Sequence, residues 1–112
     1  MDVADFRDFC LSMPDVTEKM PFQQFKTAQS ILAFYVGEHI FCFYDIDKFD
    51  ECTVKCPPEQ IEPLEDKYVA VGAPYNMSHK YWIGIKFNSD MPDAMLHKLV
   101  KQSYELVKSE HK

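Results

Sequence analysis

The fold is decided by one stretch of sequence, Ser30-Ile-Leu-Ala-Phe-Tyr-Val-Gly-Glu-His-Ile-Phe-Cys-Phe-Tyr44. It contains two runs rich in β-branched and aromatic residues, Ser30–Val36 and Ile40–Tyr44, which are typical of strands. Between them, Gly37-Glu38-His39 is a tight-turn sequence, so the stretch predicts a β-hairpin. Because both runs are apolar on both sides, we expect the hairpin to lie inside a sheet rather than at its edge.

Helical periodicity is visible at both ends of the chain. Residues 3–13 carry apolar side chains at spacings of three and four, with Asp2 as a candidate N-cap and Pro14 as the stop. A last helix is expected to begin at Pro92, with Lys98 among the residues of its solvent face. Its predicted buried face consists of Met95, Leu96, Leu99, Val100, Leu106 and Val107.

The middle of the chain predicts two more strands and one more helix. Thr53–Cys56 and Trp82–Phe87 alternate in polarity as strands do, and a short strand start is possible at Pro21 and Phe22. A helix is expected from Pro57 to about Tyr68, with a restart near Pro63 because proline removes a helical hydrogen bond.

The predicted order is helix, meandering strands, helix, strand, helix. Strands joined by short turns make a mainly antiparallel sheet, so we expect a two-layer α+β fold with the N- and C-terminal helices packed on one face. The 112 residues suit a single domain, 1–112. No apolar run approaches the ~20 residues that span a bilayer, so no membrane association is expected.

The charge of the chain is unevenly distributed. The net charge is −6, but residues 1–66 carry −9 and residues 67–112 carry +3. An acidic chain argues against strong non-specific binding of duplex DNA, which needs clustered cations, while the basic second half leaves room for a small basic face.

Sequence signatures of enzymes and metal sites are missing. There is no glycine-rich phosphate loop, no nucleophile elbow and no zinc-protease motif, so we predict a non-enzyme without a cofactor. The four cysteines form no C-x-x-C pair, and the acidic loop from Asp45 to Glu51 lacks the spacing and glycine of a calcium loop. No export signal is visible, so a cytoplasmic protein with reduced thiols is the default expectation.

The most informative face is that of the strand Trp82–Phe87. Alternation places Trp82, Gly84 and Lys86 opposite the predicted core side. Lys55 on a neighbouring strand, and His79 and Lys80 just before Trp82, are candidates to join them. An exposed aromatic ring beside cations suits nucleic-acid bases and phosphates. The alternative is that Trp82 packs under a loop or helix, with Gly84 giving it room.

Several motifs together resemble those of the MmcQ/YjbR-like family. They are Cys10-Leu-Ser-Met-Pro-Asp-Val-Thr-Glu18, Val36-Gly37, Val54-Lys-Cys-Pro-Pro-Glu59, Tyr75-Asn-Met-Ser-His-Lys-Tyr-Trp82 and Gln102-Ser-Tyr-Glu105. The resemblance extends from about residue 7 to residue 108. It implies a CyaY-like (frataxin-like) α+β fold in a small bacterial protein, and a DNA-binding function.

The stretch before Trp82 departs from the family pattern, which typically reads H-M-N-K-x-H-W. Here Asn76 and Tyr81 replace the two histidines, and His79 stands at the lysine position. The candidate nucleic-acid-binding residues of this chain are therefore Lys55, Asn76, His79, Lys80, Trp82 and Lys86.

Three functions stay open at the level of sequence. The first is a non-enzymatic nucleic-acid-binding module that uses these six residues. The second is a module that binds another protein, or a second copy of itself, through the aromatic sheet face. The third is an enzyme or metal carrier, suggested by the frataxin-like fold and by the acidic side chains of Asp2, Asp5 and Asp8 on the first helix, although fold alone does not transfer function.

Overall fold

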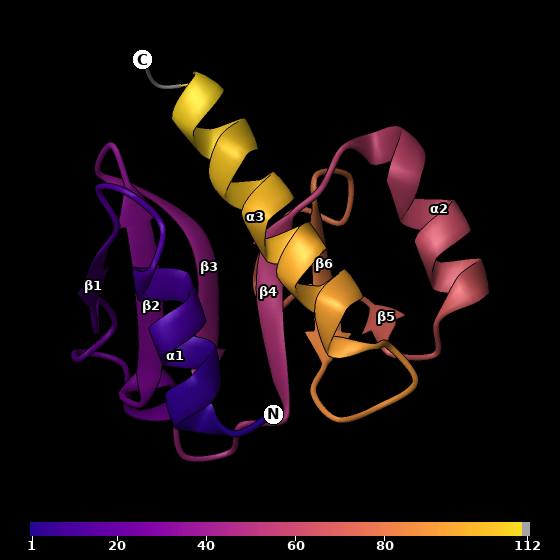
Figure 1. Cartoon of the computed structure of the whole chain (residues 1–112). Coiled ribbons are helices and arrows are strands. Elements are labelled where there is room, and N and C mark those ends of the chain that lie inside the picture. Colours follow the sequence, from indigo (N-terminus) through magenta and orange to yellow (C-terminus); the bar gives the residue numbers. More distant parts are fainter. Residues whose placement is uncertain (111–112) are drawn as a thin grey trace.

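Two helices cover one face of an antiparallel sheet in the computed structural model, which describes residues 1–110 (Figure 1). The helices are α1 (Val3–Leu11), α2 (Pro58–Lys67) and α3 (Asp93–Glu110), with a short 3-10 helix η1 (Lys26–Ala28). The strands are β1 (Thr17–Lys19), β2 (Ile31–Val36), β3 (His39–Asp45), β4 (Glu51–Lys55), β5 (Val71–Gly72) and β6 (Trp82–Lys86). Their spatial order is β1-β2-β3-β4-β6-β5, and each neighbouring pair is antiparallel. The predicted α+β class, with both terminal helices on one face, is confirmed.

The predicted hairpin is formed by β2 and β3 and lies inside the sheet, because β1 flanks β2 and β4 flanks β3. A β-bulge interrupts its register: Phe34 pairs with Cys42, but Tyr35 pairs with Ile40, which leaves Phe41 without a partner. The extra residue lets the consecutive side chains of Phe41 and Cys42 both enter the main core.

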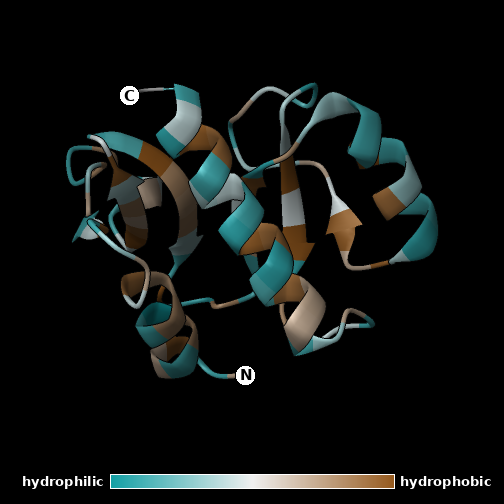
Figure 2. Ribbon diagram, turned by 45° about the horizontal axis from the view of Figure 1, so that its top comes forward, coloured by the Kyte–Doolittle hydropathy of each residue, from teal (hydrophilic) through white to brown (hydrophobic). Residues whose placement is uncertain are grey.

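The main core lies between the sheet and the helices α1 and α3. Phe6 and Cys10 of α1 are fully buried there, and apolar residues follow the inner side of α3 (Figure 2). All four cysteines are free and buried, and burial raises the pKa of the Cys56 thiol to about 11. Ser103 and Tyr104 extend the predicted buried face of α3.

Two helices differ from their predicted limits. The side chain of Asp2 caps α1 as expected, but the helix ends at Leu11, two residues before the expected end. The predicted restart of α2 near Pro63 is wrong, because one helix continues through this proline. Pro63 and Glu59 are both exposed, so water can solvate the Glu59 carbonyl that the proline leaves without a donor.

The opposite face of the sheet, which we call the rear face, has a smaller core of its own. Ala28, Ile31, Ala33 and Phe43 are buried there, and Met77 packs against them. The cover comes from irregular segments, residues 20–30 and residues 73–81. The possible strand start at Pro21 is also wrong, since the short strand of this region is β1, which precedes it.

Candidate functional site

A segment between β5 and β6 crosses the rear face. We call residues 73–81 the strap. The amide of Tyr75 donates to the hydroxyl of Thr53 on β4 at 3.3 Å. The carbonyl oxygen of Ala73 lies so close to Gly84 on β6 that a Cβ atom there would approach it to 2.5 Å. Glycine is therefore required at position 84, and the surface around it is covered rather than flat and open.

Three adjoining hollows follow one another along the rear face, and we call them together the rear groove. The acidic end, of about 160 Å³, is lined by Thr27, Ile31, Phe43, Tyr44, Asp45, Lys48, Asp50, Glu51, Thr53 and Tyr75. The aromatic middle, of about 390 Å³, is lined by Phe22, Phe25, Thr27, Ala28, Ile40, Phe43, Tyr75, Asn76 and Met77. The split end, of about 370 Å³, is lined by Tyr35, Glu38, His39, Ile40, Lys55, Met77, Trp82 and Val107. Shared lining residues join each hollow to the next.

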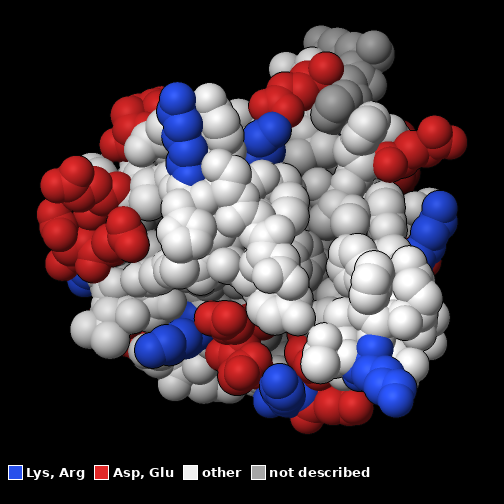
Figure 3. All heavy atoms as spheres, turned by 180° about the vertical axis from the view of Figure 1, so that it is seen from behind, with Lys and Arg blue, Asp and Glu red and all other residues white. Residues whose placement is uncertain are grey.

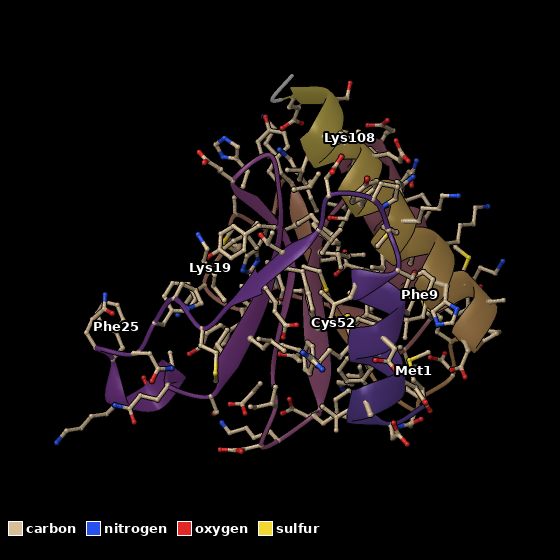
Figure 4. All side chains as sticks on the ribbon, turned by 60° about the vertical axis from the view of Figure 1, so that its left-hand side comes forward. Met1, Phe9, Lys19, Phe25, Cys52 and Lys108 are labelled. Atoms are coloured by element: carbon tan, nitrogen blue, oxygen red, sulfur yellow. The ribbon has the colours of Figure 1, made fainter. Side chains whose placement is uncertain are left out.

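The aromatic middle carries no charged residue in its lining. Phe43 forms its floor and meets the ring of Tyr75 edge to face, with centroids 6.4 Å apart. Phe25 is 54% exposed, and in Figure 4 it lies beside η1 and far from α1 and α3, on the other side of the sheet from Phe9. Seen from behind, the centre of the molecule is uncharged and the charged side chains lie around it (Figure 3).

The split end exists because β3 and β4 separate there. Their pairing stops at Cys42 and Val54. Beyond this point Ser103 of α3 bridges the gap: its hydroxyl donates to the Phe41 carbonyl at 2.5 Å and accepts from the Lys55 amide at 2.8 Å. One serine thus satisfies a buried acceptor and a buried donor that the sheet leaves unpaired.

The cation of the split end has an internal partner. The ammonium group of Lys55 pairs with the Glu110 carboxylate in the last turn of α3. The side chain of Lys55 is only 22% exposed, whereas that of Glu110 is 44% exposed. The helix that supports the split therefore also neutralises its lysine.

The acidic end has a different electrostatic character. Burial raises the pKa of Glu51, and the nearby Asp50 adds to this increase, while Lys86 opposes it. Burial also works to raise the pKa of Asp45, but hydrogen bonds from the Lys48 amide, the Ser30 hydroxyl and the Asp47 amide outweigh it and hold that pKa below its usual value. The ionised carboxylate of Asp45 thus holds the loop after β3 through hydrogen bonds from its backbone amides.

A pH-dependent loss of stability is expected from Asp45. Its lowered pKa means that the ionised form stabilises the fold above the unfolded pKa, near 4, and that this contribution disappears as the pH falls through the folded pKa. Asp45→Asn should lower the free energy of unfolding by about 1 kcal/mol at pH 7. Urea unfolding at pH 7 and pH 3 checks this, with Asp47→Asn as the exposed control. An Asp45→Asn effect that is equal at both pH values would contradict it.

Two of the six predicted site residues are brought together. Lys55 and Trp82 are direct partners across β4 and β6, and both line the split end. Trp82 is half-buried, which lies between the exposed ring of the first interpretation and the packed ring of the alternative. Lys86 points to the same face but lies four residues along β6, about 13 Å away, opposite Glu51.

The other three predicted residues belong to the strap. Asn76 lines the aromatic middle and adopts a left-handed backbone conformation with φ of 51°. His79 and Lys80 are exposed, and the Lys80 ammonium lies 5.5 Å from the Tyr81 ring centroid. The six residues therefore do not form one cluster.

The residues that sequence analysis missed are those that line the aromatic middle. Phe22 and Phe25 stand in a mixed polar segment, where an exposed aromatic residue is the only available signal. Tyr75 and Met77 lie within a stretch that the sequence singled out for other residues. Their convergence depends on the path of the strap.

Grouped metal-ligating side chains and membrane-spanning helices are both absent from the part of the chain that the structure describes. Among residues 1–110, no three His, Cys, Asp or Glu side chains are grouped so as to hold a metal ion. Within the same range, no helix has the length and apolar character needed to traverse a bilayer.

Known proteins share this architecture. The chain is similar to Deinococcus radiodurans protein DR2400, which has a DUF419 domain, with 26% identity, a TM-score of 0.84, and coverage of 95% of this chain and 78% of that one. A Pseudomonas syringae protein shows the same fold at 19% identity and a TM-score of 0.79, with coverage of 96% and 99%. No curated protein matches significantly. The YjbR family model matches residues 11–106, so this chain belongs to the YjbR family.

Proposed function

We propose that this protein is a non-enzymatic binding module that holds an extended apolar segment of a partner protein in the acidic end and the aromatic middle of the rear groove. The observation that carries the proposal is the aromatic middle: a hollow of about 390 Å³ whose lining contains no charged residue. Its size falls in the range of about 300–1,000 Å³ typical of ligand sites. The four free, buried cysteines suit a protein that works in the reducing cytoplasm.

Exposed aromatic residues at this hollow need a partner to leave water. Phe25 is 54% exposed and Tyr75 is 38% exposed, although both line the same hollow as the buried side chain of Phe43. Aromatic side chains that line a pocket are typical of the residues that contribute most to the free energy of protein binding. Closing this hollow with an apolar side chain would remove both rings from water.

The acidic end of the rear groove indicates which charge the partner segment should carry. Asp45, Asp50 and Glu51 line it against the single cation of Lys48. A partner segment with a basic residue beside its apolar part would complement this end, and burial of Glu51 makes a nearby cation more favourable.

Nucleic-acid binding is a second candidate, supported by one specific observation. Tyr81 is 43% exposed with the Lys80 ammonium above it, and the half-buried Trp82 lies next along the chain. Stacking of unpaired bases on such rings is sequence-tolerant and does not need a duplex. However, Lys55 pairs with Glu110 and Lys86 lies opposite Glu51, so phosphate groups would meet few uncompensated cations.

An array of short peptides that samples apolar cores with and without a flanking lysine or arginine tests the proposal. We expect selection of apolar cores with a basic flank, and loss of that binding in Phe25→Ser and Tyr75→Ser. Val69→Ser is the matched control, because Val69 is 77% exposed but does not line the rear groove.

These variants and Tyr81→Ser separate the competing functions. Salt-sensitive binding of a single-stranded oligonucleotide that Tyr81→Ser weakens, without peptide selection, would favour the second candidate. Concentration-dependent dimerisation in sedimentation that Phe25→Ser abolishes would identify a second copy as the occupant. Peptide selection that is unchanged in Phe25→Ser and Tyr75→Ser would contradict a role of the rear groove.

A further inference from the structure

The split end differs from the rest of the rear groove in holding a shielded cation. Its volume of about 370 Å³ lies between Tyr35 and Ile40 on one side and Lys55 and Trp82 on the other. The gap is set by the backbone, because Ser103 bridges β3 and β4 where their pairing ends. The hollow therefore results from the separation of two strands and not from the position of one side chain.

Two of the rings that line this hollow stand near a lysine each, and one lysine and one glutamate, Lys55 and Glu38, belong to the lining itself. The indole of Trp82 and the phenol of Tyr35 both line it. Lys55, which also lines the hollow, is the direct partner of Trp82 across β4 and β6. The ammonium of Lys19 lies 5.1 Å from the Tyr35 ring centroid. Aromatic walls with an adjacent cation suit a flat ring that carries a negative charge.

Glu110 already supplies a carboxylate to this place. Val107 lines the hollow, and Glu110 follows it by one helical turn, which brings its carboxylate to the Lys55 ammonium. The pair joins a mostly covered cation to an exposed anion at the end of a helix. A pair of this kind contributes little to stability, so a better-placed anion can replace the carboxylate.

We propose that the split end binds a small planar aromatic anion, an aryl carboxylate or aryl phosphate, and that Glu110 occupies its cation in the free protein. The ring lies between Tyr35 and Trp82, and the anionic group takes the place of the Glu110 carboxylate at Lys55. Binding then releases the last turn of α3 from the sheet. This site does not depend on the partner segment proposed for the aromatic middle.

The chain offers a direct probe, because Trp82 is the only tryptophan and gives a single indole N–H signal in NMR spectra. Phenyl phosphate and benzoate should shift this signal saturably. Inorganic phosphate and benzyl alcohol, which lack the ring or the charge, should bind more weakly. In thymidine 5′-monophosphate a sugar separates the ring from the phosphate. Tighter binding of this nucleotide than of phenyl phosphate would contradict the assignment to simple aryl anions, and weaker binding would support it.

Three variants test the role of the ion pair. Glu110→Gln should tighten phenyl phosphate binding by about two- to fivefold, the equivalent of losing a partly exposed ion pair. Lys55→Gln should weaken it at least tenfold, and Lys55→Arg should restore most of the affinity. Glu105→Gln, on the exposed side of α3, and Lys86→Gln, at the other end of the sheet face, should leave it unchanged.

Several results would overturn the proposal. One is the absence of a saturable shift of the Trp82 signal up to roughly 10 mM phenyl phosphate, which means no useful affinity. If benzyl alcohol binds as tightly as phenyl phosphate and Lys55→Gln changes neither affinity, the hollow is an apolar site without a role for the cation. If Glu110→Gln leaves the affinity for phenyl phosphate unchanged, the Glu110 carboxylate does not compete with the ligand for Lys55.

Discussion

Ser103→Ala should destabilise the protein by about 2–4 kcal/mol, a large effect for the loss of one oxygen atom. The hydroxyl is fully buried and serves both the Phe41 carbonyl and the Lys55 amide. Its removal leaves one acceptor and one donor buried without partners, and each such group costs about 1–3 kcal/mol. Because these groups belong to β3 and β4, the loss falls on the point where the sheet divides.

Chemical denaturation measures this effect, with Ser109→Ala as the control. Ser109 lies on the same helix but is exposed, so its loss should change the free energy of unfolding by less than about 0.5 kcal/mol. Hydrogen exchange gives a local readout, since the Lys55 amide should lose protection in Ser103→Ala. If both serine variants are equally stable, Ser103 does not bridge the strands.

Gly84→Ala should displace the strap and cost about 1–3 kcal/mol. The new Cβ would lie 2.5 Å from the Ala73 carbonyl oxygen, a backbone atom that cannot turn away as a flexible side chain can. The strap must then lift from β6, and with it the lining that Tyr75 and Met77 give to the aromatic middle. Peptide binding should fall together with stability.

Gly72→Ala is the matched control, because Gly72 pairs directly with Gly84 in the sheet. A Cβ at position 72 would meet nothing within 4 Å. This variant should be neutral, or more stable by up to about 1 kcal/mol through the reduced freedom of the unfolded chain. Similar stability losses in both variants would mean that the strap does not constrain position 84.

Much of the architecture could be predicted because local patterns specify it. The runs around Gly37 give the hairpin, and alternation in Trp82–Lys86 correctly places Ile83 and Ile85 in the core and Trp82 on the other side. The Asp2 cap depends only on contacts within one helical turn. These features depend on residues that are close together in the sequence, so a local sequence pattern contains the information that specifies them.

The features that shape the candidate site depend on distant residues, and sequence patterns do not contain them. Ser103 reaches a carbonyl 62 positions earlier, and although its spacing from Leu99 and Val107 puts it on the buried side of α3, the helical pattern does not show which groups it meets there. Lys55 and Lys86 were correctly assigned to one face, but the register that places one opposite Trp82 and the other opposite Glu51 arises from strand pairing. The path of the strap across the rear face turns the predicted face of Trp82, Gly84 and Lys86 into part of a groove.

Chemical-shift mapping with a peptide selected on the array tests the central claim, that the partner segment lies in the rear groove. We predict that the largest backbone shifts occur in residues 22–28 and 75–77 and in the adjoining part of β3, around Phe43. The outer surfaces of α1 and α3 should remain unchanged. Shifts concentrated on those helices, with none around Phe43 and Tyr75, would contradict the claim.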